Sequence, residues 1–414
     1  MKQLFCIGGE TSNQVPTNST NAVLCLAERN TTWDFNDDGG RYNVAPANGT
    51  IGILGYYVQS GPGAGEFFKL YVDVNDVDST DFALIEDVDT YDSQTFVTVV
   101  VAGNKLNVKA TESDTSIARK CSWSLGWEGT TSGQAIMGHL SCRPLADVAP
   151  LTGTWHYSPI GSSLTTVHST AALYAPFAGT IKSFYILIDK SNLFDGSGSM
   201  TFSIYKNGAE EASAQVVFDE TDNSGNVTGL SVAISAGDTI TYTATAAGTI
   251  TDVKKGTLMM SVMYEPATDG ESWIGGGTET AISSASTLYF AMNQVEGTTT
   301  GDTVEVDRQV ISGGDFSLKD FRVNLGTAPG VGKSRTFRVR KDGVNTDIVV
   351  TISDASTSGV DSTNTATFAE GSLFSISETP SGTPANSTMR WSAIMYDVDY
   401  ASLPTILARP MYLD

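Results

Sequence analysis

The chain has 414 residues, of which 46 are acidic and 24 are basic, so its formal net charge is −22. A balance this acidic argues against wrapping nucleic acid or lying on an anionic membrane, because both need clustered cations. Charged residues make up only 17% of the chain, whereas Gly, Ser, Thr, Asn, Asp and Val are abundant, which is typical of short strands joined by tight turns. We therefore predict an all-β fold, without a nucleic-acid or membrane partner.

The N-terminal region carries all four cysteines, Cys6, Cys25, Cys121 and Cys142. They lack C-x-x-C spacing and are not grouped with histidines, so a zinc site is not expected. They are candidates for one or two disulfides, with three pairings open, and buried thiols are the alternative. The first residues, MKQLFCIGGE, hold an apolar patch too short for the core of a secretory signal.

Two acidic clusters raise the question of calcium. Asp34, Asn36 and Asp38 match the opening of a calcium loop, but the twelfth position is Ala45 instead of a bidentate glutamate, which excludes the helix–loop–helix version. A β-loop presenting these three residues is the remaining way to hold a hard cation, and they are our candidate metal ligands. The second cluster is DVNDVDSTD (73–81). A solvated turn with Asx caps is favoured for both clusters, and no other cofactor is predicted.

Four landmarks recur three times in the same order, which indicates internal repetition. The last landmark is an apolar-rich strand that ends on an aromatic residue followed by an acid. The three pairs are Trp127-Glu128, Tyr264-Glu265 and Tyr396-Asp397. Before each of these strands lies a turn glycine, at Gly103, Gly237 and Gly371, separated by 134 and 134 residues. We predict three tandem antiparallel β-sandwich domains of one repeated, jelly-roll-like type. The expected organisation is an N-terminal arm (1–20), sandwiches at 21–147, 152–268 and 281–400, and a C-terminal tail (401–414).

The stretch GTAPGVGKSRTF (326–337) is a near match to the phosphate-binding loop G-x-x-x-x-G-K-[ST]. The first glycine should stand where Thr327 is. The following residues alternate, with Phe337 and Val339 on one face and Arg338 and Arg340 on the other, which predicts a strand where a phosphate loop would open a helix. The stretch is therefore interpreted as a loop of a β-connection.

Cations are concentrated in the same region, with seven Lys or Arg against one acid between residues 319 and 341. In so acidic a chain this is a candidate self-association surface that would meet acid on a neighbouring subunit. A solvated face is the alternative. The residues assigned to this surface are Arg335, Arg338, Arg340 and Lys341.

Groups for catalysis are not brought together by any sequence motif. The three histidines, His139, His156 and His168, are spread over 30 residues and stand outside G-x-S-x-G or H-E-x-x-H patterns. We therefore predict that the chain is not an enzyme. If it bound glycans instead, loop aromatics such as Trp33 and Trp273 would stack on the sugars.

The third copy's APGVGKSRTFRVRKDG (328–343) and SGTPANSTMRWSAIMYD (381–397), echoed by MTFSIYKNG (200–208), resemble the jelly-roll-like modules of tailed-phage virion proteins. The pattern is also similar to the trimeric C1q/TNF-like sandwiches, whose last strand carries aromatic residues. The resemblance implies a bacteriophage head decoration, collar, spike or tail-fibre component, located in the virion. It would form a homotrimer or a larger assembly with other virion proteins. A modular glycan- or host-receptor-binding protein or adhesin, extracellular or at a cell surface, is the alternative.

Overall fold

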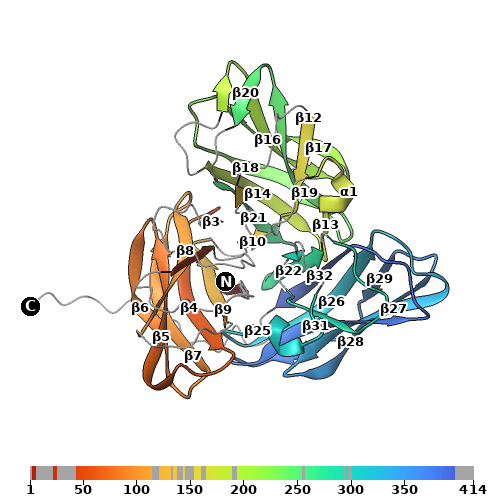
Figure 1. Cartoon of the computed structure of the whole chain (residues 1–414). Helices are drawn as coiled ribbons and strands as arrows, with labels where there is room; N and C mark the ends of the chain where they lie inside the picture. Colours follow the sequence, from red (N-terminus) through yellow and green to blue (C-terminus); the bar gives the residue numbers. More distant parts are fainter. Residues whose placement is uncertain are drawn as a thin grey trace, which may run out of the picture.

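The computed structural model describes residues 2–5, 22–25, 43–113, 121–131, 134–137, 143–144, 153–159, 165–188, 194–253, 257–278, 280–292, 295–296 and 301–396. These residues form an all-β protein with several antiparallel sheets, which confirms the predicted fold class. The one short helix and the one 3-10 turn in this part of the chain are α1 (His168–Ala171) and η2 (Glu305–Arg308). The strands gather in three lobes (Figure 1).

The first sandwich consists of two sheets that enclose one apolar core. One sheet has the order β1 (Lys2–Phe5), β9 (Cys121–Gly129), β4 (Gly49–Val58) and β7 (Tyr91–Val100). The other has the order β2 (Ala22–Cys25), β8 (Lys105–Glu112), β5 (Gly63–Val74) and β6 (Val77–Asp87), with β3 (Asn43–Val44) also on β8. The inward residues of both sheets occupy alternate positions along the strands, and they include Leu54, Tyr56, Phe68, Leu70, Val108 and Trp123.

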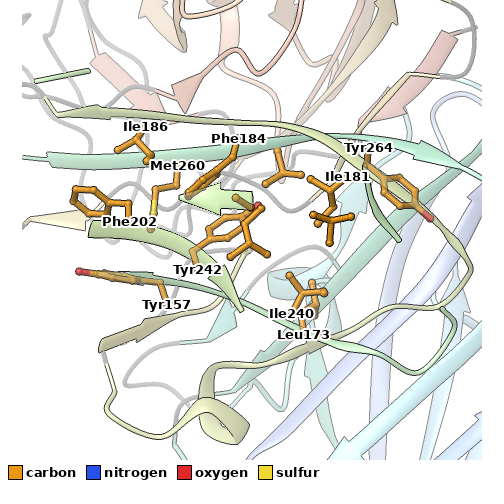
Figure 2. Packing of buried hydrophobic residues seen from close by; sticks show 14 of the residues in the cluster. Tyr157, Leu173, Ile181, Phe184, Ile186, Phe202, Ile240, Tyr242, Met260 and Tyr264 are labelled. Carbon is orange, nitrogen blue, oxygen red and sulfur yellow. The ribbon is translucent and has the colours of Figure 1, made fainter. Parts of the chain in front are cut away.

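The second sandwich also consists of two main sheets. Its first sheet runs β10 (Ala135–Met137), β21 (Thr257–Pro266), β14 (Gly179–Ile188) and β18 (Ser224–Ile234), with β11 (Arg143–Pro144) on β21. Its second runs β12 (Gly153–Tyr157), β19 (Thr239–Ala247), β16 (Ser199–Lys206) and β17 (Ala209–Phe218), with β13 (Leu173–Tyr174) on β19; β15 (Phe194–Gly196) and β20 (Ile250–Val253) form a small ribbon. Figure 2 shows Phe184 and Tyr242 meeting between the sheets, with ring centroids 5.4 Å apart.

The third sandwich has the order β24 (Val295–Glu296), β22 (Glu271–Thr278), β32 (Met389–Tyr396), β26 (Phe316–Leu325) and β29 (Ser358–Asp361), with β30 (Ala366–Phe368) on β26. The facing sheet runs β23 (Leu288–Phe290), β31 (Leu373–Ser381), β27 (Gly330–Lys341) and β28 (Val344–Asp354), with β25 (Val310–Ile311) on β31. All pairings in these two sheets are antiparallel except β22 with β24. The stacked rings of Phe316 and Phe368 anchor the core.

The predicted turn glycines are confirmed, because all three adopt the left-handed conformation that a side chain disfavours. Their φ angles are 88°, 93° and 81° at Gly103, Gly237 and Gly371. Each glycine also donates its N–H to the main-chain carbonyl of the residue that directly follows β3, β13 or β25 of the same sandwich. The acceptors are Ala45, Ala175 and Ser312, each at 2.8 Å.

The strand predicted at Phe337 and Val339 is confirmed, but the predicted loop is shorter than expected, because β27 already begins at Gly330 and its pairing with β28 is irregular between Gly330 and Ser334. Gly330 and Gly332 have φ angles of 101° and 70°, and the N–H of Gly332 donates to Oδ1 of Asp354 over 2.7 Å. Strand β27 then carries Phe337 and Val339 into the core, as the period of two requires. The Gly-Lys-Ser sequence lies within this strand and does not open a helix.

Four strand pairings lie outside the domain bounds expected from the sequence. Strand β1 pairs with β9, β10 and β11 pair with β21, and β22 pairs with β32. Each of these strands precedes the sandwich to which it is hydrogen bonded. The expected bounds placed them in an arm, in the preceding sandwich and in a linker, respectively.

Candidate functional site

The three sandwiches contact one another in a closed ring, and these junctions are the candidate functional site. Strand β3 of the first sandwich packs against β21 of the second, β13 of the second packs against β32 of the third, and β25 of the third packs against β9 of the first. Each contact therefore joins a short strand of one sandwich (β3, β13 or β25) to the last strand of another (β21, β32 or β9). The contacts run from the first sandwich to the second, from the second to the third, and from the third back to the first. In Figure 1 the three lobes surround a common centre.

The first junction is mainly apolar. Val44 of β3 packs with Met259 of β21, and Tyr185 and Leu187 flank this pair. The buried hydroxyl of Ser183 donates to the carbonyl oxygen of Pro46 over 2.8 Å. Apolar burial and one satisfied polar group are what a permanent contact needs.

The second junction is built around an aromatic pair. Trp273 and Ile394 of the third sandwich join the hydrophobic core of the second, where the rings of Trp273 and Phe177 lie 6.5 Å apart in an edge-to-face arrangement. A Cβ atom on Gly275 would lie 3.2 Å from Cδ1 of Leu173, so this glycine permits close packing. Trp273 is only 5% exposed, which corrects its assignment as an exposed sugar-stacking residue; Trp33 lies outside the described residues.

The third junction closes the ring through backbone contact. A Cβ atom on Gly313 would lie 2.4 Å from Oγ of Ser124, and one on Gly55 would lie 2.9 Å from Cα of Gly313. At the edge of this junction the hydroxyls of Tyr91 and Ser93 both donate to Oε1 of Glu370. There is therefore no space for a side chain at Gly55 or Gly313, where the third sandwich meets β4 and β9.

The predicted self-association residues do not form one surface. Arg335 is fully buried, because it lies on the same face of β27 as Phe337 and Val339, and it is ion-paired with Glu378 over 2.7 Å. Its inclusion among surface residues was therefore wrong. Arg340 forms a two-point ion pair with Glu305, at 2.6 and 2.7 Å, and the Lys341 ammonium donates to the carbonyl oxygen of Thr367.

Arg338 is the member of this set that points away from the core without an ion pair or hydrogen bond in the described part of the chain. Its neighbours on the outward face, Thr336 and Arg340, are bonded within the third sandwich. A surface for a second subunit on this face of the strand would therefore rest on Arg338 and the ion-paired Arg340, since Lys341 lies on the other face, opposite Phe374.

The predicted metal ligands Asp34, Asn36 and Asp38 lie outside the described residues. The turn predicted for the second acidic cluster is confirmed at Asn75 and Asp76, whose φ angles are 54° and 66°. Its other acids belong to the flanking strands, with Asp73 on β5 and Asp78 and Asp81 on β6. Within the described ranges, no three His, Cys, Asp or Glu side chains converge as a metal site would require.

Of the disulfide candidates, Cys121 is a buried thiol at the start of β9. That matches the alternative to a bridge at this position. Cys6 and Cys142 lie outside the described residues, and Cys25 is described only by its place in β2.

Two histidines meet on the outward face of the second sandwich. Nδ1 of His156 and Nδ1 of His168 lie 3.1 and 3.0 Å from the same hydroxyl, that of Thr241, and Nε2 of His168 lies 3.0 Å from the Thr239 hydroxyl. Burial, with a smaller effect from His156, lowers the pKa of His168 to about 4. Both nitrogens of the ring are thus engaged by threonines, and the neutral ring holds α1 on the sheet.

Sequence comparison adds no family to this picture. No protein-family model matches the chain, and no curated protein is significantly similar to it. Among the described residues, no helix is long and apolar enough to cross a membrane.

Proposed function

We propose that the chain is a non-enzymatic structural protein of a virus particle, in which three sandwiches form a trimer-like unit within one polypeptide. The observation that carries the proposal is the closed ring, in which each sandwich packs on the next through corresponding strands. A head-to-tail contact repeated in one direction either closes or grows into an open filament. The trimeric C1q/TNF-like sandwiches close this way between separate chains, and here one chain supplies all three units.

The proposal includes three jelly-roll-like domains of one repeated type. Their bounds are β1 to β9, β10 to β21 and β22 to β32, so that each domain includes the strand that pairs with its last strand. Matching details of the β-hairpins support the repeat. In each hairpin turn a side-chain oxygen, that of Asn75, Asn207 or Asp342, accepts the backbone N–H of Lys105, Thr239 or Leu373, respectively.

Placement in a virion is supported by the resemblance of residues 328–343 and 381–397 to tailed-phage modules. Two ion pairs support a structural role, because they join charged side chains of the third sandwich to each other. Arg335 pairs with Glu378, and Arg340 pairs with Glu305. The partners are then other virion proteins, and further copies of the chain in a larger assembly. The glycan- or receptor-binding alternative loses Trp273 as a binding residue, since that side chain is buried.

Light scattering on the full-length chain tests the trimer-like unit. We expect a mass near one chain, 43.8 kDa, in dilute solution, because the ring is complete within it. A stable mass near 3 × 43.8 ≈ 131 kDa would instead support the homotrimer predicted from the sequence and would count against closure within one chain.

Mass spectrometry of purified particles tests the virion placement. Particles whose genome encodes this chain should contain it as a stoichiometric component, and its absence from them would overturn the placement. A glycan array with the recombinant chain tests the alternative, since specific binding there would favour a receptor-binding protein.

A further inference from the structure

Asp73 and Asn107 are a buried polar pair on the first sandwich. They are directly opposed partners in strands β5 and β8, and their exposed fractions are 6% and 2%. Within the described part of the chain, Oδ1 of Asp73 and Oδ1 of Asn107 have no hydrogen-bond partner. Buried acceptor oxygens without a donor or a cation are unfavourable, so a ligand that satisfied both of these oxygens would stabilise the fold.

A third oxygen-bearing side chain lies in the same row. Asp78 on β6 is the directly opposed partner of Asp73 on its other side, so Asp78, Asp73 and Asn107 cross three neighbouring strands on one face of the sheet. That face points away from the core, into which the alternate residues Leu70 and Val72 project. Oδ2 of Asp78 contacts the Lys109 ammonium at 2.9 Å.

The electrostatics of the row favour a cation. The pKa of Asp73 is raised to about 6, mainly by burial and in part by the nearby Asp78 and Asp76 carboxylates, against the main-chain N–H of Asp76 that lowers it. The Lys109 ammonium lies beside this row of two carboxylates and one amide oxygen, and it contacts Asp78. A bound cation would remove the repulsion between the carboxylates and satisfy the orphaned oxygens together.

The other two sandwiches satisfy the corresponding positions with their own side chains. In the third, Arg340 and Ser375 occupy this place, and both are bonded to Glu305. In the second, Thr241 occupies the place of Asn107 and contacts His156 and His168. The described residues of the first sandwich supply no such partner for the two buried oxygens, which sets this row apart.

We propose that Asp73, Asp78 and Asn107 bind one calcium ion on the outward face of the sheet β2-β8-β5-β6. Calcium accepts carboxylate and amide oxygens in irregular arrangements and completes its coordination with water and carbonyl oxygens. Asp73, Asp78 and Asn107 offer oxygen atoms, the ligands that calcium prefers, instead of the imidazole nitrogen and thiolate sulfur that zinc and copper prefer. On its other side, Asn107 is directly opposed by Cys25 of β2, so one thiol-bearing residue continues the row. The site holds two carboxylates and an amide, so it differs from the clusters of three carboxylate, imidazole or thiol groups that are missing from the described residues.

Calorimetric titration of the EDTA-treated, dialysed full-length chain with calcium chloride tests this site. We expect about one ion per chain with a dissociation constant of roughly 10⁻⁴ to 10⁻³ M, the range of modules with few protein ligands. Asp73→Asn should abolish the binding, while Asp81→Asn, on the same hairpin, should leave it unchanged. Absence of binding at millimolar calcium would overturn the proposal, as would unchanged binding in Asp73→Asn.

Two further variants distinguish this site from calcium binding elsewhere in the chain. Asp34→Asn should retain the ion; loss of binding there, with retention in Asp73→Asn, would assign calcium to the 34–38 segment and refute the site. Asn107→Asp should bind calcium more tightly than the natural chain and unfold at a lower temperature in EDTA. Calcium should raise the unfolding midpoint of the natural chain but not that of Asp73→Asn, which stays folded because it removes a buried charge.

Discussion

The guanidinium of Arg335 contacts the carboxylate of Glu378 at 2.7 Å, and neither side chain is exposed to solvent. Burial raises the pKa of Glu378 to about 7 although Arg335 opposes this shift. The same guanidinium donates to the carbonyl oxygens of Ser283 and Ala385, at 3.0 and 2.9 Å. One side chain therefore joins β27 to β31 and to the segments that precede β23 and β32.

Replacing one partner of this pair should be costly. Arg335→Met leaves Glu378 and two carbonyl oxygens without their partner, and we expect it to lower the free energy of unfolding of the third sandwich by about 3–5 kcal/mol. The double variant Arg335→Met, Glu378→Leu should recover much of that loss. Urea titration measures both, and Arg338→Met, on the outward face of the same strand, should change stability by at most about 0.5 kcal/mol. Equal losses for Arg335→Met and Arg338→Met would contradict the buried pair.

The ring closure can be opened at one glycine. Gly313→Ala places a methyl group against Oγ of Ser124, and we expect a loss of about 1–3 kcal/mol, the usual cost of overpacking. Adding Ser124→Ala removes the clashing oxygen and should recover part of the loss. Small-angle scattering should show a larger radius of gyration for Gly313→Ala and a smaller change for the double variant. Additive effects of the two substitutions would argue against direct contact.

The second sandwich should lose stability in mild acid through His168. Its pKa is lowered to about 4 in the fold, against about 6.5 for an unfolded histidine, so the unfolded chain takes up the proton first. The stabilisation is complete above about pH 6.5 and is lost as the pH falls towards 4. Melting temperatures of the natural chain and of His168→Gln, compared between pH 7.5 and 4, should converge as the pH falls. A constant difference across this range would contradict a neutral, buried His168.

Asp361 should confer stability that disappears only in stronger acid. Burial opposes its ionisation, but hydrogen bonds from the Asn364 amide and from the main-chain N–H groups of Val349, Asn364 and Thr363 hold its pKa at about 2. The contribution is therefore present above about pH 4 and lost as the pH falls towards 2. Asp361→Ala should cost roughly 1–3 kcal/mol at pH 7 by urea titration, because it leaves buried donors unsatisfied. A deficit that persists unchanged at pH 2.5 would show that charge plays no part.

Local features of the fold could be predicted because they depend on nearest neighbours. A glycine at position 103, 237 or 371 marks a positive φ, and the alternation at Phe337 and Val339 marks a strand. The same alternation places Arg335 on the core face, two residues before Phe337. That signal is present in the sequence, but the basic composition of the strand conceals it.

The ring could not be predicted, because it depends on contacts between distant residues of no distinctive type. Gly275 and Gly313 resemble ordinary turn glycines in the sequence, yet both permit one sandwich to approach another. The run Gly275-Gly276-Gly277 likewise suggests a linker in the sequence. In the structure it belongs to β22, which is held in an extended conformation by its antiparallel pairing with β32. Trp273 resembles a loop residue in the sequence for the same reason.

Closure within one polypeptide frees the three junctions from having to be alike. In a ring of identical chains every substitution appears three times, whereas here the corresponding positions of the last strands carry Gly126, Met263 and Ile394. Neighbouring units are also held at a high local concentration by the connecting chain, so dilution does not separate them. One side of the molecule can therefore acquire a new contact while the other two keep their shape.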